Sequence, residues 1–325
     1  MLEEILKAHK PVDVSQMRAK DFLMRQKEIE LEKIERVLKG SGFRDVLMCP
    51  LCGSKDSQLE LKKHSIDLLH CKNCDVRFNA RIPADLNDIY DDAHYVVHSK
   101  EDSDEHFKYR RTRFGSERVQ ILETLCGSLK EKQLLDIGCG SGFFISAAAE
   151  KCEHVYGLEY SDIRRFKAVR RTGLTVFSQS LDELPKRDFD IITAFDVLEH
   201  IPEPIPFMQS VDAILNPDGY LFLYVPNFDS LSMRVMREYS PAIDSTEHVL
   251  FYNHNSLRFL ANIFRHDIIY TETQGMDIDN IISMLEYLKE PMNLFLIQWR
   301  QEFQAMINAS QCADSLRILF RKHRA

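Results

Sequence analysis

Apolar runs alternate with amphipathic segments between residues 133 and 225 of the chain. The runs predict strands at 133–137, 154–159, 174–177, 190–195 and 220–225, and the segments between them predict helices near 143–151, 161–171 and 203–215. Alternation of strand and helix with short connections is typical of βαβ units around a parallel sheet. We therefore expect an α/β fold.

The segments on either side of this pattern add further elements. A helix is predicted at 106–125 before the first strand. After the fifth strand we expect a helix capped by Asn255, a strand at 266–274 and two helices within 278–310 that Pro291 interrupts. The closing sequence DSLRILFRKH fits a helix or a strand equally well.

Residues 14–38 predict one charged helix that ends before the glycines at 40 and 42. Four apolar residues recur in it every seven positions: Met17, Met24, Leu31 and Leu38. A heptad spacing favours self-association as a homo-oligomer, but the companion core positions hold Lys20 and Lys27. The alternative is a helix that lies on the surface of its own protein.

Four of the eight cysteines stand in two CxxC pairs that eighteen residues separate. They are Cys49, Cys52, Cys71 and Cys74. Each pair makes a tight knuckle, and two knuckles complete a tetrahedral site for Zn²⁺. Four thiolates leave no open position for water, so we expect a structural zinc ion. Simple packing or a redox role for the cysteines is the alternative.

This cysteine module divides the chain. We expect an N-terminal helical segment at residues 1–45, a zinc ribbon at 46–82, a polar, acidic linker at 83–105 and an α/β domain at 106–325.

The loop after the first strand of the sheet has the sequence GCGSG at 138–142. A glycine-rich turn between a strand and a helix lets the backbone approach a nucleotide-like ligand closely. The dinucleotide fingerprint GxGxxG requires a further glycine at position 143, where this chain has Phe143. A nicotinamide-dependent oxidoreductase is therefore disfavoured but remains an alternative.

An acidic residue, Glu159, ends the second strand, 21 residues after Gly138. A carboxylate in this place is suited to accept hydrogen bonds from both hydroxyls of a ribose. The loop and the acid together resemble the first motifs of the class I, Rossmann-like methyltransferases that use S-adenosylmethionine.

The resemblance continues along the chain. The segments FDIITAFDVLEHIPEP (189–204), LNPDGYLFLYVPN (215–227) and EHVLFYNHNSLRFLANIF (247–264) look like corresponding parts of the group that includes the ubiquinone-biosynthesis methyltransferases. The resemblance implies a seven-stranded, mostly parallel sheet with helices on both faces, and makes residues 106–325 the S-adenosylmethionine-binding domain. It also implies that the closing segment is an antiparallel strand.

Ten positions match residues with which this family binds its cofactor. The resemblance places Asp136, Gly138, Gly140 and Gly142 at the methionine end of S-adenosylmethionine, and Glu159 at the ribose. It places Tyr160, Ser180 and Leu181 beside the adenine, and Phe195 and Asp196 beneath the sulfonium.

Methyl transfer is an in-line displacement, so the protein mainly has to align the reacting groups. A neutral hydroxyl acceptor also needs a base. His200 follows the fourth strand and His248 the fifth, where ligands of α/β sheets bind, and either could be a base near neutral pH. A packing role is the alternative for both. Glu247 could orient His248, and Glu199 could be solvated surface.

We therefore expect a methyltransferase that acts on a small polar acceptor, with a sugar hydroxyl of a surface glycan or its precursor as the leading candidate. A cofactor-binding scaffold or interaction protein without turnover is the alternative from another class. The lack of an unambiguous catalytic base favours that alternative.

The formal net charge of −8 disfavours nonspecific binding to nucleic acid. No apolar run approaches the ~20 residues that cross a bilayer, and the N-terminus is too charged for a signal peptide. We expect a cytoplasmic protein without a membrane span.

Overall fold

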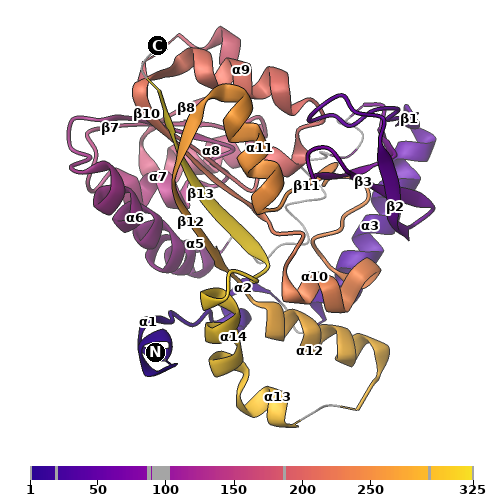
Figure 1. The fold of residues 1–325 in the computed structure, drawn as a ribbon. Helices are drawn as coiled ribbons and strands as arrows, with labels where there is room; N and C mark the ends of the chain where they lie inside the picture. The colour runs from indigo at the N-terminus through magenta and orange to yellow at the C-terminus, as the bar shows by residue number, and fades with distance from the viewer. Residues whose placement is uncertain are drawn as a thin grey trace.

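The computed structural model describes residues 2–18, 21–85, 89, 103–185, 188–291 and 294–323 (Figure 1). Most of the predicted linker at 83–105 lies outside these residues. None of the helices within them combines the length and the apolar character that a membrane crossing requires.

A seven-stranded sheet forms the centre of the molecule, in the order β12-β13-β10-β9-β6-β7-β8 (Figure 1). Its strands are β6 (Gln133–Ile137), β7 (His154–Leu158), β8 (Thr175–Phe177), β9 (Phe189–Phe195), β10 (Leu215–Pro226), β12 (His266–Gln274) and β13 (Ser315–Lys322). β13 runs antiparallel to both β10 and β12, and all the other pairs are parallel. The predicted seven-stranded, mostly parallel sheet is confirmed.

Helices cover both faces of this sheet. They are α5 (Asp104–Arg110), a π-helical turn (η3, Arg111–Gly115), α6 (Ser116–Cys126), α7 (Phe143–Ala148), α8 (Asp162–Thr172), α9 (Pro204–Ile214) and α11 (His254–Phe264). One core cluster joins α9 and α11 to Leu135 and Ile192, and a second joins α6 and α7 to their neighbours Leu134 and Ile191. Successive residues of a strand point to opposite faces of the sheet. Because helices bury both faces, every position of a central strand is apolar, and the strand appears in the sequence as an unbroken apolar run.

The closing segment is strand β13, as the resemblance implies. Five consecutive residues, Leu316 to Phe320, are buried because β13 lies between β10 and β12 and both of its faces are covered. A fully buried strand has no polar alternation, so its sequence could not be distinguished from that of a helix.

The cap of α11 differs from the prediction. The side chain of Asn253, and not that of Asn255, accepts the backbone N–H of Ser256 at 2.9 Å and completes a capping box. Asn255 instead donates to Asp75 at 2.9 Å. Both asparagines precede the same apolar run and both donate to Asp75, so the sequence alone does not distinguish them.

The cysteine module is built into the α/β domain. Its sheet has the order β11-β4-β3-β2 and consists of β2 (Ser57–Lys63), β3 (Ile66–Cys71), β4 (Arg77–Asn79) and β11 (Leu250–Phe251). A separate pair joins β1 (Phe43–Asp45) to β5 (Arg81–Pro83). The edge strand β11 comes from the segment after β10, so one sheet contains residues from both parts of the chain.

The predicted single helix at 14–38 is wrong. The chain forms α1 (Leu2–Ala8), α2 (Val14–Met17) and α3 (Phe22–Lys39), and Arg18 after α2 has an extended backbone. Its Nη1 donates to Asn280 Oδ1 at 2.5 Å, a tertiary contact that overrides the local periodicity.

The exposed face of α3 carries the heptad residues. Met24, Leu31 and Leu38 are 50%, 52% and 65% exposed, whereas the buried face holds Leu23, Glu30, Lys33 and Val37. The helix thus lies on its own protein, which was the alternative considered, and self-association stays a prediction.

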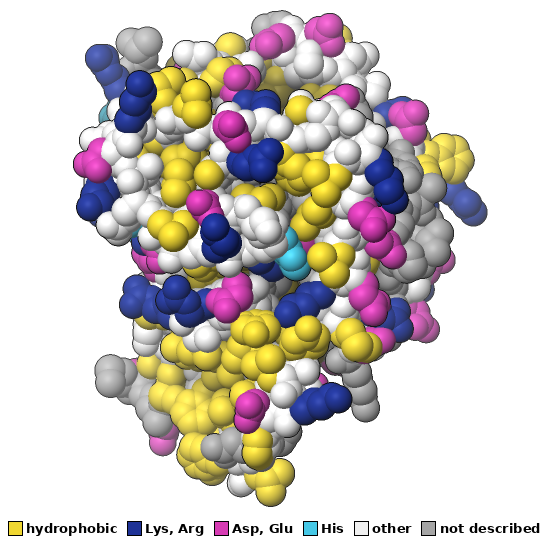
Figure 2. Space-filling view, turned by 90° about the vertical axis from the view of Figure 1, so that its right-hand side faces the viewer, with side chains coloured by type: hydrophobic (Ala, Val, Ile, Leu, Met, Phe, Trp, Pro, Cys, Tyr) yellow, Lys and Arg dark blue, Asp and Glu magenta, His cyan; other side chains and the backbone are white. Residues whose placement is uncertain are grey.

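A helical region lies at the lower end of the sheet as drawn in Figure 1. It contains α10 (Leu231–Met236), α12 (Asp277–Leu288), α13 (Leu294–Gln298) and α14 (Arg300–Ala309). Hydrophobic side chains gather on the lower part of the surface in Figure 2, and Leu294 and Phe295 of α13 are among the exposed ones. Short 3₁₀ turns occur at Leu181–Glu183 (η4), Leu198–His200 (η5) and Arg237–Tyr239 (η6).

Candidate active site

The glycine loop joins β6 to α7 at the carboxyl edge of the parallel strands. Gly138, Gly140 and Gly142 have φ angles of 69°, 55° and 90°, which other residues rarely adopt. The backbone N–H of Gly138 donates to Leu158 O at 2.8 Å, and a Cβ on Gly138 would lie 2.5 Å from Val197 Cγ2. The loop therefore requires glycine for both its conformation and its close packing.

Cys139 fills the space behind this loop. It is buried against Gly157 of β7, where an added Cβ would lie 2.7 Å from the Cys139 sulfur. Burial raises the pKa of the Cys139 thiol well above its ordinary value, so it stays a packing residue without thiolate chemistry.

Glu159 lies beside the glycine loop, at the end of β7. Its two carboxylate oxygens accept the backbone N–H groups of Gly140 and Ser161, each at 2.9 Å. The side chain is buried. These two bonds fix the carboxylate and leave each oxygen a further lone pair for a ligand hydroxyl.

Asp136 is buried at the end of β6 and accepts a 2.6 Å hydrogen bond from the Thr193 hydroxyl. Burial raises the pKa of Asp136 to about 7, although Thr193 and the charge of Arg118 act in the opposite direction. A cationic ligand beside this buried carboxyl group would stabilise its ionised form.

Arg118 of α6 is a site residue that the sequence did not reveal. It is 4% exposed, and its guanidinium lies over the rings of Phe195 at 4.2 Å and Tyr224 at 4.8 Å. Across the described residues no carboxylate forms an ion pair with it, and its Nε has no hydrogen-bond partner. Burial lowers the pKa of Arg118 to about 10, so it remains a cation at neutral pH.

An unpaired buried cation is costly, and such a group is typical of a site for an anionic ligand. The signal in the sequence was weak but present. Gly115, Arg118, Val119 and Leu122 recur at helical spacing and are all buried, so the arginine occupies an apolar-face position of the helix.

The remaining predicted cofactor residues differ in their surroundings. Phe195 is buried between Phe144 and Phe222, with ring centroids 4.9 and 5.3 Å away. Asp196 follows it with a φ of 57°. Tyr160 is 65% exposed.

Ser180 and Leu181 lie after β8. The Ser180 hydroxyl donates to Glu183 at 2.9 Å, and the Leu181 side chain is buried in the core. The carboxyl edge thus combines Asp136, the glycine loop, Glu159 and Phe195, and Leu181 faces the core.

His200 and His248 come together as a pair, with ring centroids 4.7 Å apart. Nδ1 of His248 lies 2.7 Å from Ala242 O, and Nδ1 of His200 lies 3.1 Å from Glu247 O. Because a carbonyl oxygen only accepts, each Nδ1 carries a proton, and in the neutral form of either ring the lone pair is on Nε2. Burial, followed by the neighbouring His248, lowers the pKa of His200 to about 3.

Two acidic residues near this pair differ from what the sequence suggested. Glu199 is 1% exposed and thus not solvated surface, and neither carboxylate oxygen has a hydrogen-bond partner within the described chain. Burial raises its pKa well above the ordinary value. The side chain of Glu247 does not orient His248; it pairs with Lys33 Nζ at 2.6 Å.

Glu199, His200 and His248 offer ligand atoms that all lie within 4.8 Å of one another. Carboxyl oxygens and imidazole nitrogens are common ligands of divalent cations, so this cluster could hold one.

The four cysteines of the two CxxC pairs converge as the spacing predicts. Their sulfur atoms lie within 4.8 Å of one another, and the Cys49–Cys74 and Cys52–Cys71 sulfur distances are both 3.5 Å. These distances are far longer than the ~2.05 Å of a disulfide and match thiolates around one tetrahedral ion. The donor set therefore fits zinc.

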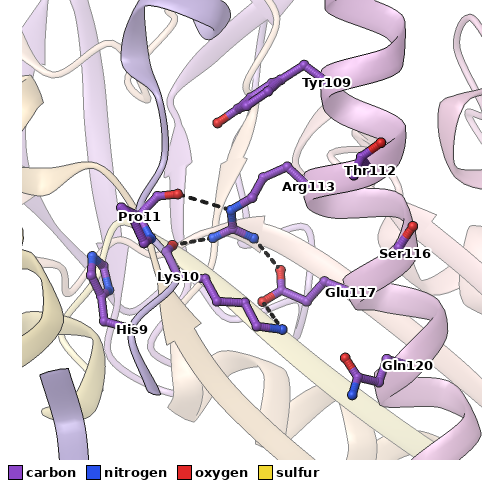
Figure 3. Close-up of a pocket in the computed structure, with 9 residues that line it drawn as sticks. All are labelled: His9, Lys10, Pro11, Tyr109, Thr112, Arg113, Ser116, Glu117 and Gln120. Atoms are coloured by element: carbon purple, nitrogen blue, oxygen red, sulfur yellow. Dashed lines mark hydrogen bonds and ion pairs between the residues drawn. The ribbon is translucent and has the colours of Figure 1, made fainter. Parts of the chain in front are cut away.

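A surface pocket of about 570 Å³ lies away from these groups, between the N-terminal segment and α5–α6. Figure 3 shows Arg113 reaching from the helix to the backbone oxygens of Lys10 and Pro11, and its Nη1 pairs with Glu117 at 2.9 Å. None of the predicted site residues lines this pocket.

The central part of the chain is similar to a known family. A family model described as a methyltransferase domain matches residues 107–266. The ubiquinone biosynthesis O-methyltransferase of Actinobacillus pleuropneumoniae serotype 7 (strain AP76) is 32% identical over 146 residues, which are 41% of this chain and 59% of the relative. The enzyme of the same name from Histophilus somni (strain 2336) is 32% identical over 34% of this chain and 51% of the relative. The chain thus spans little more than half the length of these relatives.

Solved structures with a similar arrangement include the magnesium protoporphyrin IX methyltransferase of Synechocystis PCC 6803 with bound SAH. It has a TM-score of 0.47 and 15% identity over 71% of this chain and 93% of that one. A SAM dependent methyltransferase from Archaeoglobus fulgidus has a TM-score of 0.45 and 18% identity, over 67% of this chain and 100% of that one.

The matched segment contains the glycine loop, Glu159 and both histidines, and its strands follow the order described above. Residues 107–266 are therefore similar to a methyltransferase domain.

Proposed function

We propose that this protein transfers a methyl group from S-adenosylmethionine to a hydroxyl oxygen of a small acceptor. The observation that carries the proposal is the charge pattern at the carboxyl edge of the sheet. A buried carboxyl group, Asp136, and an unpaired buried cation, Arg118, stand beside a glycine loop and Glu159. This pattern suits a ligand with a zwitterionic amino-acid end and a ribose.

Each part of the cofactor has a complementary group in the chain. Asp136 would hold the α-ammonium group, Arg118 the α-carboxylate and Glu159 the ribose hydroxyls. The bound cofactor supplies an electrophilic methyl group on a sulfonium. The protein aligns the acceptor and excludes water, which accounts for a large part of the acceleration in displacement reactions.

The acceptor atom is proposed from two observations. The curated relatives are named O-methyltransferases, which supports oxygen and gives no support to a surface glycan. The histidine pair supports a hydroxyl, because a neutral imidazole Nε2 can take the proton that a hydroxyl must lose. We assign this role to His248, since the pKa of about 3 makes His200 a poor proton acceptor.

We further propose that Cys49, Cys52, Cys71 and Cys74 hold one structural zinc ion. Cys71→Ser should remove the zinc and lower the melting temperature, because metal binding to such ribbons contributes on the order of 10 kcal/mol to folding. Elemental analysis and thermal unfolding measure both effects. Cys312→Ser, at an exposed cysteine outside the cluster, is the control and should keep one zinc per chain. Wild-type protein without zinc would refute the site.

Arg118→Met should weaken S-adenosylmethionine binding about 10- to 100-fold. The substitution keeps an unbranched stem but removes the guanidinium, and with it a charge-assisted hydrogen bond worth roughly 1.5–3 kcal/mol. Calorimetric titration measures the dissociation constant. The matched control is Arg170→Met at an exposed position of α8, which should leave it unchanged. Equal affinities of all three proteins would contradict the assignment of Arg118.

Binding should also depend on pH through Asp136. Its pKa is about 7 without ligand, and an ammonium group favours the ionised form, so binding releases a proton below that pH. Affinity should therefore rise as pH increases toward 7, by up to about tenfold per unit, and level off above it. Asp136→Asn should bind more weakly at pH 8 and lose the dependence. A wild-type affinity that is constant from pH 5.5 to 8 would be inconsistent with this role.

The proposed reaction is tested by transfer of a labelled methyl group into a fractionated cell extract, followed by mass spectrometry of the product. We expect a small O-methylated product. His248→Ala should slow its formation roughly 10²- to 10⁴-fold, the usual contribution of a general base. His323→Ala, at an exposed residue after β13, should retain wild-type activity. A product methylated on carbon or nitrogen would overturn the hydroxyl assignment.

A further inference from the structure

The segment 240–249, here called the histidine loop, contains His248 and determines the orientation of both histidines. Its Ala242 oxygen accepts from His248 Nδ1, and its Glu247 oxygen accepts from His200 Nδ1. The N–H of Val249 donates to Glu199 O at 2.9 Å. Whatever holds the histidine loop therefore also holds the two imidazole rings.

The loop has little regular structure of its own. Asp244 organises it from within, because its Oδ1 accepts the N–H groups of Thr246 at 2.8 Å and Glu247 at 3.0 Å, and the Thr246 hydroxyl at 2.7 Å. A single turn of this kind cannot fix a ten-residue segment. Contacts from outside the loop must fix the remainder of its conformation.

Two residues of helix α3 supply some of these contacts, although the helix lies far away in the sequence. Glu30 accepts the N–H of Ser245 at 2.8 Å and its hydroxyl at 2.9 Å. Lys33 Nζ pairs with Asp244 at 3.3 Å and with Glu247 at 2.6 Å. Lys33 thus joins Asp244, which organises the turn, to Glu247, whose carbonyl oxygen holds His200.

The ribbon supplies the others. Asn79 Nδ2 donates to His248 O at 3.0 Å and to Ser245 O at 3.3 Å. Lys63 pairs with Glu30 at 2.8 Å and also donates to Ile243 O. Figure 1 shows α3 beside the ribbon strands β2 and β3.

The charges in this interface are buried, which is unusual for a structural contact. Glu30, Lys33, Lys63 and Asp244 are all at most 8% exposed. Burial acts to raise the pKa of Asp244, but Lys33 and His248 hold it well below its ordinary value. Buried ion pairs add little stability compared with apolar packing of the same shape, whereas they define geometry. Their position around the histidine loop indicates that geometry is their role.

We propose that Lys33 is a positioning residue for the His200–His248 pair, and that α3 and the ribbon together clamp the histidine loop. This inference rests on the proposed function for its meaning, because it makes the N-terminal part of the chain a component of the acceptor site. Lys33 acts through its ion pairs with Glu247 and Asp244.

The test compares Lys33→Met with Lys39→Met in the full-length protein. Lys39 lies on the same helix in an exposed ion pair with Glu35 and is the matched control. Lys33→Met should lower kcat about 10- to 100-fold, the usual effect of a small misplacement of catalytic groups, and leave the dissociation constant of S-adenosylmethionine unchanged. Lys33→Arg should have a kcat between those of Lys33→Met and the wild type. Lys39→Met should keep the wild-type kcat.

A second readout needs no acceptor. Long-range ¹H–¹⁵N spectra report the tautomer of each imidazole, and the signals of the pair are assigned by their loss in His200→Ala and His248→Ala. In Lys33→Met both sets of signals should shift, and in Lys39→Met neither should. Unmoved signals in folded Lys33→Met would overturn the proposal, even if no methyl acceptor has been found. If Lys33→Met does not fold, Glu247→Gln serves in its place and should shift the His200 signals.

Discussion

The pairing of β11 with β4 is the contact on which the arrangement of the molecule depends. Two residues, Leu250 and Phe251, add the segment after β10 to the sheet of the ribbon. The cysteine cluster is thereby placed in the same apolar core as α9 and α11. A zinc ion in that cluster would stabilise a wall of the candidate acceptor site as well as the ribbon, since Asn79 at the end of β4 holds the histidine loop.

The two halves of the candidate site, the carboxyl edge of the sheet and the histidine pair, differ in how their charges are compensated. At the proposed cofactor edge, burial raises the pKa of Asp136 to about 7 and lowers the pKa of Arg118 to about 10, so it disfavours the charged form of each. At the histidine pair, the charges of the clamp compensate one another within the protein, and carbonyl oxygens hold both imidazole rings. Under the proposed function the cofactor would compensate the buried charges of the first half, whereas contacts within the protein organise the second.

Local patterns in the sequence predicted much of this. The glycine spacing, Glu159 and the cysteine pairs lie in short motifs whose geometry is set by nearby residues, and the strands were visible as apolar runs. Contacts between distant segments were not visible. The break at Arg18, the cap at Asn253 and the burial of Glu199 all depend on partners remote in the chain. In the sequence, Lys33 is one of many charged residues in a predicted charged helix. Arg118 matches no motif that a single sequence reveals.

The central claim is that the carboxyl edge of this sheet binds S-adenosylmethionine. Isothermal titration of the purified wild-type chain with S-adenosylmethionine, with its demethylated product S-adenosylhomocysteine and with NAD tests it most directly. We predict one site per chain for the first two, competition between them, and no heat of binding with NAD. A chain that is folded and binds NAD, or that gives no heat with S-adenosylmethionine, would contradict the claim.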